Sequence, residues 1–225
     1  MQAPSRLREE VRILAPGYFA FVMAGGIVST GLHLRGFHLA SAVLLIVSAI
    51  GYATLVALSV WRFFAFRDEV RADLADSGRA FGFFTFVAGS NVLGVRLMMD
   101  GWHSTAAVLL VGAAATWLVL GYVVPWTAVL GTAERPVLAK ANGTWFIWVV
   151  ASESVAIAAA TLQPVYRELD RLLAALAVFT WGVGLFLYAA AGVFAAVRML
   201  EYPLRPHRPD RPLLGSSRLS GVPGS

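Results

Sequence analysis

The chain lacks cysteine altogether and carries few charges for its length. Its 225 residues include no Cys, and Asp, Glu, Lys and Arg together make up 14% of them, against roughly 25% in soluble domains. The absence of cysteine excludes disulfide bonds, thiolate metal sites and a catalytic thiol. The scarcity of charge, together with 58% hydrophobic residues, argues against a water-soluble domain and favours a membrane protein.

Charge is almost absent from six long stretches, and residues 39–61, 104–130 and 172–197 contain no Asp, Glu, Lys or Arg at all. A helix rises about 1.5 Å per residue, so about 20 apolar residues cross the hydrocarbon core of a bilayer. The stretches are apolar on every face, which excludes the alternating pattern of a β-barrel. The sequence therefore predicts an all-α transmembrane bundle of six spans, at about 16–34, 37–61, 80–99, 104–130, 144–162 and 172–197.

The basic residues are distributed unevenly between the two sides of such a bundle. With six spans, the termini and the loops after spans two and four share one side, which receives 14 of the 18 Lys and Arg residues. By the positive-inside rule that side is cytoplasmic. We therefore expect a multi-pass protein of the inner (plasma) membrane, with a cytoplasmic segment 1–15, a transmembrane domain 16–199 and both termini cytoplasmic. The net charge of +5 then reflects topology, so the expected partner is the lipid bilayer and not nucleic acid.

Spans one, three and five carry more small and polar residues than spans two, four and six. This alternation predicts helical hairpins in which one helix of each pair faces inward. Gly25 and Gly26 in span one have two interpretations. Small residues let membrane helices pack closely, or they leave room for a transport pathway that a side chain would block.

Glu153 lies in the middle of span five, where a carboxylate is costly unless it faces the protein interior or water. From the helical rise, Glu153 lies about 13 Å and Asn91 about 16 Å along spans that both run outward from the cytoplasm. We therefore expect these two side chains to face a common polar interior. The alternative is a protonated Glu153 that hydrogen-bonds to a neighbouring helix and has no role in transport.

Arg96, near the end of span three, also has two interpretations. Its long side chain can snorkel to the outer surface, or its charge can belong to a funnel that attracts anions to an outer mouth. The four histidines have no partner at metal-ligand spacing, and no nucleotide or nucleophile motif is present. We therefore expect no metal, no cofactor and no enzymatic activity, since Glu153 also lacks a second catalytic group at its depth.

Three motifs in order along the chain resemble the tellurite-resistance/dicarboxylate transporter (TDT) family, which is related to the slow-type anion channels of plants. They are residues 16–29 (PGYFAFVMAGGIVS), residues 81–86 (FGFFTF) through 91–94 (NVLG), and residues 142–146 (NGTWF) followed by 152–154 (SES). The resemblance implies a fold of ten helices in five hairpins, whose odd-numbered helices line a central pore, and members that form trimers. It also implies a pore wall that includes Gly25, Gly26, Phe83, Asn91 and Glu153.

The chain departs from that family pattern in its number of spans. Six spans are predicted where the family has ten, and the phenylalanine that occludes the family's pore, on the ninth helix, has no counterpart. Residues 200–225 form a polar segment rich in Pro and Arg, a composition typical of disorder. One interpretation is a flexible cytoplasmic tail. The other, which we favour, is a reading-frame shift or truncated gene near residue 204.

Two functions follow from these observations. The first is an integral membrane transporter or channel for small anions, such as C4-dicarboxylates or tellurite-related anions, through a pore lined by the odd-numbered helices. Selection in such a pore would rest on its width and on weak polar contacts. The alternative is a truncated, non-conducting membrane fragment or assembly partner, which would show no flux of its own.

Overall fold

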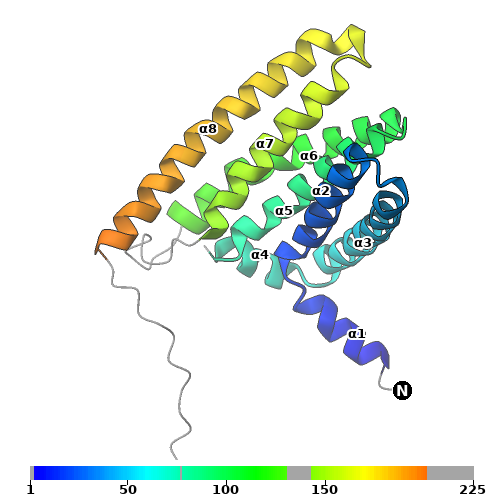
Figure 1. Ribbon diagram of the computed structural model, residues 1–225. Helices are drawn as coiled ribbons and strands as arrows, with labels where there is room; N and C mark the ends of the chain where they lie inside the picture. The colour runs from blue at the N-terminus through cyan, green and yellow to red at the C-terminus, as the bar shows by residue number, and fades with distance from the viewer. Residues whose placement is uncertain (1–2, 77, 131–142, 202–225) are drawn as a thin grey trace, which may run out of the picture.

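The computed structural model describes residues 3–76, 78–130 and 143–201, and most of this part of the chain is helical (Figure 1). A short N-terminal helix and a helix between the first two hairpins accompany the long apolar helices. The α-helices are α1 (Ala3–Arg12), α2 (Ala20–Leu34), α3 (His38–Ala65), α4 (Arg67–Ala75), α5 (Phe84–Met98), α6 (His103–Val124), α7 (Phe146–Leu162) and α8 (Asp170–Glu201).

Five helical stretches are long and apolar enough to cross a membrane, at Pro16–Leu34, His38–Ala65, Ala80–Met98, His103–Thr127 and Arg167–Val197. The sixth predicted span is the shorter apolar helix α7, of 17 residues. A 3-10 turn, Gly143–Trp145, leads directly into it. The predicted helical membrane bundle is therefore confirmed. Helix α6 ends at Val124, and a π-helical turn, Pro125–Leu130, follows it within the predicted span 104–130.

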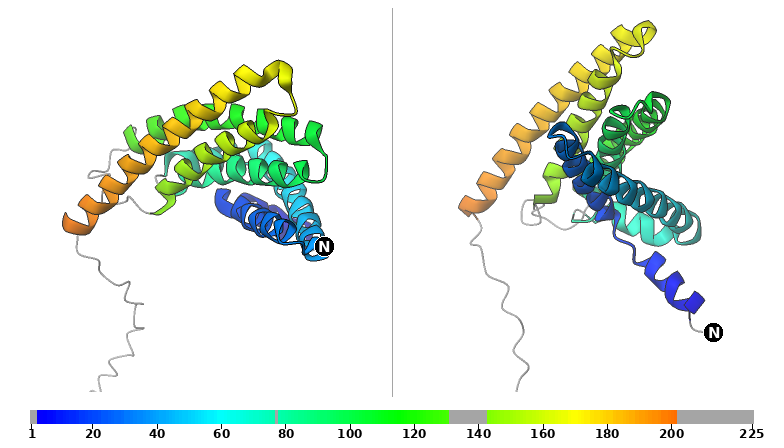
Figure 2. Two further views of the ribbon diagram at one scale, coloured as in Figure 1. Left: turned by 45° about the horizontal axis from the view of Figure 1, so that its top comes forward. Right: turned by 45° about the vertical axis from the view of Figure 1, so that its right-hand side comes forward.

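The long helices form three hairpins, α2 with α3, α5 with α6, and α7 with α8. Helix α5 contacts both α2 and α7, so the first helices of the three hairpins form a continuous row. Figures 1 and 2 show α3 and α8 at the two edges of this arrangement and α5 between them. Burial follows this order, because 67% of the membrane window of α5 is buried and only 6% of that of α3.

Two of the hairpins turn on the same short sequence pattern, a charged residue followed by Gly, an aromatic residue and His. Gly36 joins α2 to α3 with a φ of 83°, and Gly101 joins α5 to α6 with a φ of 82°. This left-handed backbone region is costly for residues with a Cβ. Glycine at these two positions therefore allows each hairpin to reverse its direction within a few residues.

Each helix of the central row begins with a 3-10 turn, at Pro16–Phe19, Ala80–Phe83 and Gly143–Trp145. The middle turn contacts the other two. A Cβ atom at Gly82 would lie 3.2 Å from the backbone nitrogen of Gly17. The absence of a side chain there brings the start of α5 against the start of α2, and so places the row in register.

Candidate functional site

The three helices of the central row, α2, α5 and α7, meet at a groove of about 470 Å³, to which α8 adds one residue. We call it the inner groove. Its lining is almost wholly apolar and comprises Met23, Ile27, Thr30, Val92, Val95, Phe146, Val149, Val150, Glu153, Ser154, Ile157 and Tyr188. Ile27, Ile157 and Tyr188 are each more than half exposed. The groove is thus a surface of this chain that nothing in the described residues covers.

Glu153 is the one charged residue among the described residues that line the inner groove. Its carboxyl group lies against Gly184 of α8, where a Cβ atom would collide with Oε1 and would approach Cδ to 3.0 Å. Gly184 therefore leaves the space that this side chain occupies between α7 and α8. A carboxylate within the membrane has a high free energy unless protein or water surrounds it. Contact between the inner groove and lipid is therefore unfavourable.

Asn91 lies behind the wall of the inner groove and is 1% exposed. Its Nδ2 donates a hydrogen bond of 3.1 Å to Ser154 Oγ, and that hydroxyl donates in turn to the Ala151 carbonyl at 2.7 Å. Ser154 itself lines the groove. Asn91 is therefore linked to Ser154, the chain neighbour of Glu153. Asn91 packs against the side of α7 that faces α5, whereas the carboxyl group of Glu153 lies between α7 and α8.

The two glycines of α2 lie at helix contacts. A Cβ atom at Gly25 would collide with Ser48 Oγ on α3, and one at Gly26 would lie 2.6 Å from Val92 Cγ1 on α5. Both positions match the close-packing interpretation, since small residues allow helix backbones to approach. Phe83 lies on another side of the molecule and lines a second cavity, between α3, α5 and α6.

Arg96 does not reach the outer surface, and the snorkelling interpretation is wrong. The residue is 1% exposed, and its Nε donates to Ser29 Oγ at 3.0 Å and to Ser41 Oγ at 3.1 Å. Its Nη1 forms an ion pair of 3.0 Å with Asp100 Oδ2. The guanidinium is occupied by groups from α2, α3 and the turn that follows α5, and it joins three helices at the interior of the bundle.

Several side chains that hold these sites together were not predicted from the sequence. Ser29 and Ser41 each donate to the other's backbone carbonyl, at 2.8 and 2.7 Å, and so form the cradle for Arg96. Trp117 Nε1 donates to Ser152 Oγ at 2.9 Å and joins α6 to α7. A serine within an apolar span could have indicated such contacts, since a hydroxyl group in a membrane helix is stabilised by a hydrogen bond to a neighbouring helix.

The fold is that of an integral membrane protein built from helical hairpins. Residues 14–214 match the SLAC1 family, described as voltage-dependent anion channel. The chain therefore belongs to this family, and its predicted relation to the slow anion channels is confirmed. Comparisons with curated proteins and with solved structures found no match.

Proposed function

We propose that this chain supplies the inner groove as one wall of a pathway for small anions across the membrane. The observation that carries the proposal is that the groove gathers residues from all three helices of the central row. Membership of an anion-channel family supports the same assignment. Gly26 and Asn91 act behind this wall by holding α2, α5 and α7 together, and Ser154 and Glu153 act at its surface.

The lining favours passage over tight binding. It offers aliphatic and aromatic side chains, with Thr30, Ser154 and Tyr188 as the neutral polar residues. Two of these hydroxyls bond to backbone carbonyls, Thr30 to Gly26 at 2.9 Å and Ser154 to Ala151 at 2.7 Å. A pore with few free polar contacts holds an ion weakly and releases it readily. Chloride and nitrate are therefore the first substrates to test, followed by C4-dicarboxylates and tellurite.

The exposed lining residues also bear on assembly. A conducting pathway must be closed on every side, and Ile27, Ile157 and Tyr188 leave the inner groove open in the single chain. We propose that further protein surface, from other copies of the chain, supplies the remaining wall in a homo-oligomer such as a trimer. In the membrane we place both termini on the cytoplasmic side, following the excess of basic residues there.

The absence of cysteine from the chain makes the accessibility of the groove directly measurable. Val150→Cys places a single thiol on the groove wall, and Val111→Cys places one on α6 at a position that is 69% exposed and outside the groove. In proteoliposomes, a water-soluble, charged thiol reagent should modify Val150→Cys and reduce anion flux. Val111→Cys should stay unmodified, because a thiol facing hydrocarbon is not ionised and does not meet the reagent.

A non-conducting assembly partner is the second candidate, favoured by the open side of the inner groove. Flux of chloride, nitrate and succinate through the purified full chain separates the two candidates. Transport that Val150→Trp blocks and Val111→Trp leaves unchanged supports the pathway. No flux for any of these anions, from protein shown to be folded and inserted, contradicts it and leaves the partner assignment.

A further inference from the structure

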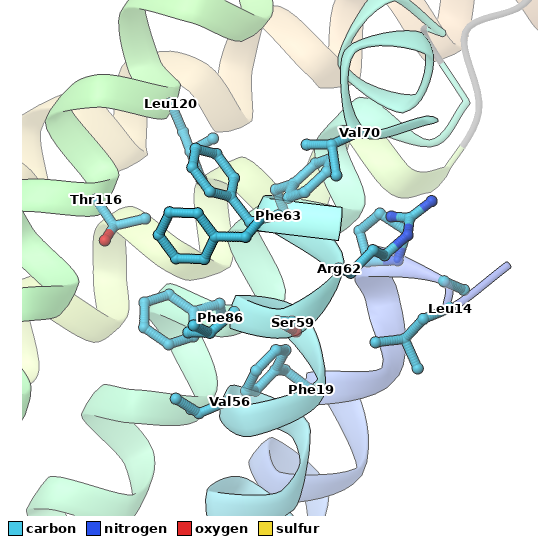
Figure 3. Close-up of a pocket in the computed structure, with 15 residues that line it drawn as sticks. Leu14, Phe19, Val56, Ser59, Arg62, Phe63, Val70, Phe86, Thr116 and Leu120 are labelled. Carbon is cyan, nitrogen blue, oxygen red and sulfur yellow. The ribbon is translucent and has the colours of Figure 1, made fainter. Parts of the chain in front are cut away.

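A second cavity, of about 400 Å³, lies between α3 and α6 (Figure 3). We call it the lateral crevice. Helix α3 packs along α2, while α6 packs along α5, and Phe86 of α5 lies on the floor between them with Phe19. These two rings meet edge to face with centroids 5.2 Å apart. Figure 3 shows Phe63 of α3 directed toward Thr116 of α6 across the crevice.

The lateral crevice is separate from the inner groove. On α5 it is lined by Phe86, and the inner groove by Val92 and Val95. At 3.6 residues per turn these two valines lie about 120° and about 180° around the helix from Phe86, so the crevice and the groove use different faces of α5. An effect on the crevice is therefore distinguishable from an effect on the proposed anion pathway.

The crevice is open along the last turns of α3. Phe63 and Phe64, which line it, are 56% and 65% exposed, and both lie at the end of the membrane-length helix α3 (His38–Ala65). Where this end of α3 meets the bilayer, the medium at the opening is lipid. A lipid chain fills an apolar cleft without the cost of an unsatisfied polar group, and every methylene that packs against the aromatic floor adds dispersion contacts.

An exposed cation lies at one end of the crevice. Arg62, on its lining, pairs with Asp73 at 2.8 Å, and Arg79 pairs with the same carboxylate at 3.0 Å, so that two arginines share one acidic group. Next to them, the exposed Arg67 lies over the ring of Phe64, with its Cζ 6.0 Å from the ring centroid. A cation at a helix end beside an apolar cleft complements a lipid phosphate.

We propose that the lateral crevice is a binding site for an anionic phospholipid. One acyl chain lies between α3 and α6 over Phe19 and Phe86, and the phosphate group lies at the end marked by Arg67. The lipid would fill the space between α3 and α6 and so join the first hairpin to the second. It would also cover the side of α5 that lies at the floor of the crevice.

The test uses the purified full chain, stripped of lipid and then offered phosphatidylglycerol or phosphatidylcholine with identical acyl chains. Native mass spectrometry measures the bound fraction of each lipid. The wild type should retain phosphatidylglycerol in preference to phosphatidylcholine. Thr116→Trp, which fills the crevice, should abolish retention, and Val119→Trp, at a 60% exposed position of the same helix outside the crevice, should leave it unchanged.

The headgroup contact has its own matched pair. Arg67→Gln should weaken phosphatidylglycerol binding by about fivefold, the effect of one cation near a membrane surface, and should reduce the preference over phosphatidylcholine. Arg71→Gln removes a 78% exposed guanidinium from the same helix and should change neither quantity. Should Thr116→Trp fail to fold, phosphatidylglycerol with a photoreactive acyl chain should instead crosslink the wild type at α3 and α6.

Three results overturn the proposal. Equal lipid retention by Thr116→Trp and Val119→Trp, or crosslinks away from α3 and α6, removes the acyl-chain site. Equal binding of the two lipids by the wild type removes the anionic headgroup. A shift in oligomeric state with Thr116→Trp, without a change in retained lipid, assigns the crevice to a contact with a second copy of the chain.

Discussion

The Nε of Arg96 on α5 donates a hydrogen bond of 3.1 Å to Oγ of Ser41 on α3, and the pair is almost fully buried. Ser29 of α2 receives a second hydrogen bond from the same nitrogen. A buried guanidinium is tolerated only when its donors are occupied. The hydroxyl pair and Asp100 meet this need, so that a cation stabilises the junction of three helices in the apolar part of the molecule.

Removal of the Arg96 side chain should therefore destabilise the fold. We expect Arg96→Ala to cost about 2–5 kcal/mol, because it removes a large buried side chain together with its hydrogen bonds to Ser29 and Ser41, and to lower the melting temperature in detergent. The control is Arg35→Ala, which removes an exposed guanidinium from the turn between α2 and α3. Melting temperatures that fall equally in both variants would show that the cradle adds nothing to stability.

Gly26 and Gly31 on α2 offer a matched pair for helix packing. Gly26→Ala places a Cβ atom against Val92 Cγ1, and overpacking of this kind costs about 1–3 kcal/mol. Gly31→Ala meets no atom within 4 Å and should be neutral or stabilise α2 by about 0.5–1 kcal/mol. Thermal unfolding distinguishes them, and adding Val92→Ala should restore the stability of Gly26→Ala. Without that rescue, the contact between α2 and α5 is not the cause.

Gly184 and Gly182 form a second pair, on α8. Gly184→Ala must displace the carboxyl group of Glu153, whereas Gly182→Ala meets no atom within 4 Å. If the inner groove conducts, the displaced carboxylate should change the ratio of chloride to succinate flux, because a moved negative charge repels a dianion more than a monoanion. Reversal-potential measurements in planar bilayers give this ratio. An unchanged ratio, with normal folding, would place Glu153 away from the ion path.

Asp73 tests the end of the first two hairpins that lies next to α4. Its carboxylate serves both Arg62 and Arg79, so Asp73→Asn should leave the buried Arg62 without its counter-ion and cost about 3–5 kcal/mol. Asp68→Asn alters a carboxylate that is 94% exposed and pairs with Arg71 at 3.5 Å, so its effect should stay below about 1 kcal/mol. Urea-induced unfolding in detergent compares the two variants.

The hairpins and the inner position of α5 could be predicted from the sequence because they depend on local composition. The polar residues of span three, among them Ser90, Asn91 and Arg96, have to be shielded from lipid. The repeated turn pattern at Gly36 and Gly101 is also visible in the sequence as an internal repeat.

The placement of the site residues could be predicted only in part. The rise per residue gives the depth of a side chain along a helix, but its direction around the axis depends on the neighbours. The similar depth of Asn91 and Glu153 could therefore be predicted, but their directions could not. Asn91 faces Ser154, and Glu153 faces Gly184. Arg96 was misplaced for the same reason, because its partners lie 55 and 67 residues away in the sequence.

The partners of Arg96 have a consequence for the biosynthesis of the chain. Ser29 and Ser41 precede Arg96, and Asp100 follows it within one helical turn. The ribosome synthesises α2 and α3 before α5. Every group that bonds to the guanidinium has therefore been synthesised when α5 leaves the ribosome. The most costly side chain of the bundle can therefore enter the bilayer already satisfied, whereas Asn91 must wait for Ser154 and the third hairpin.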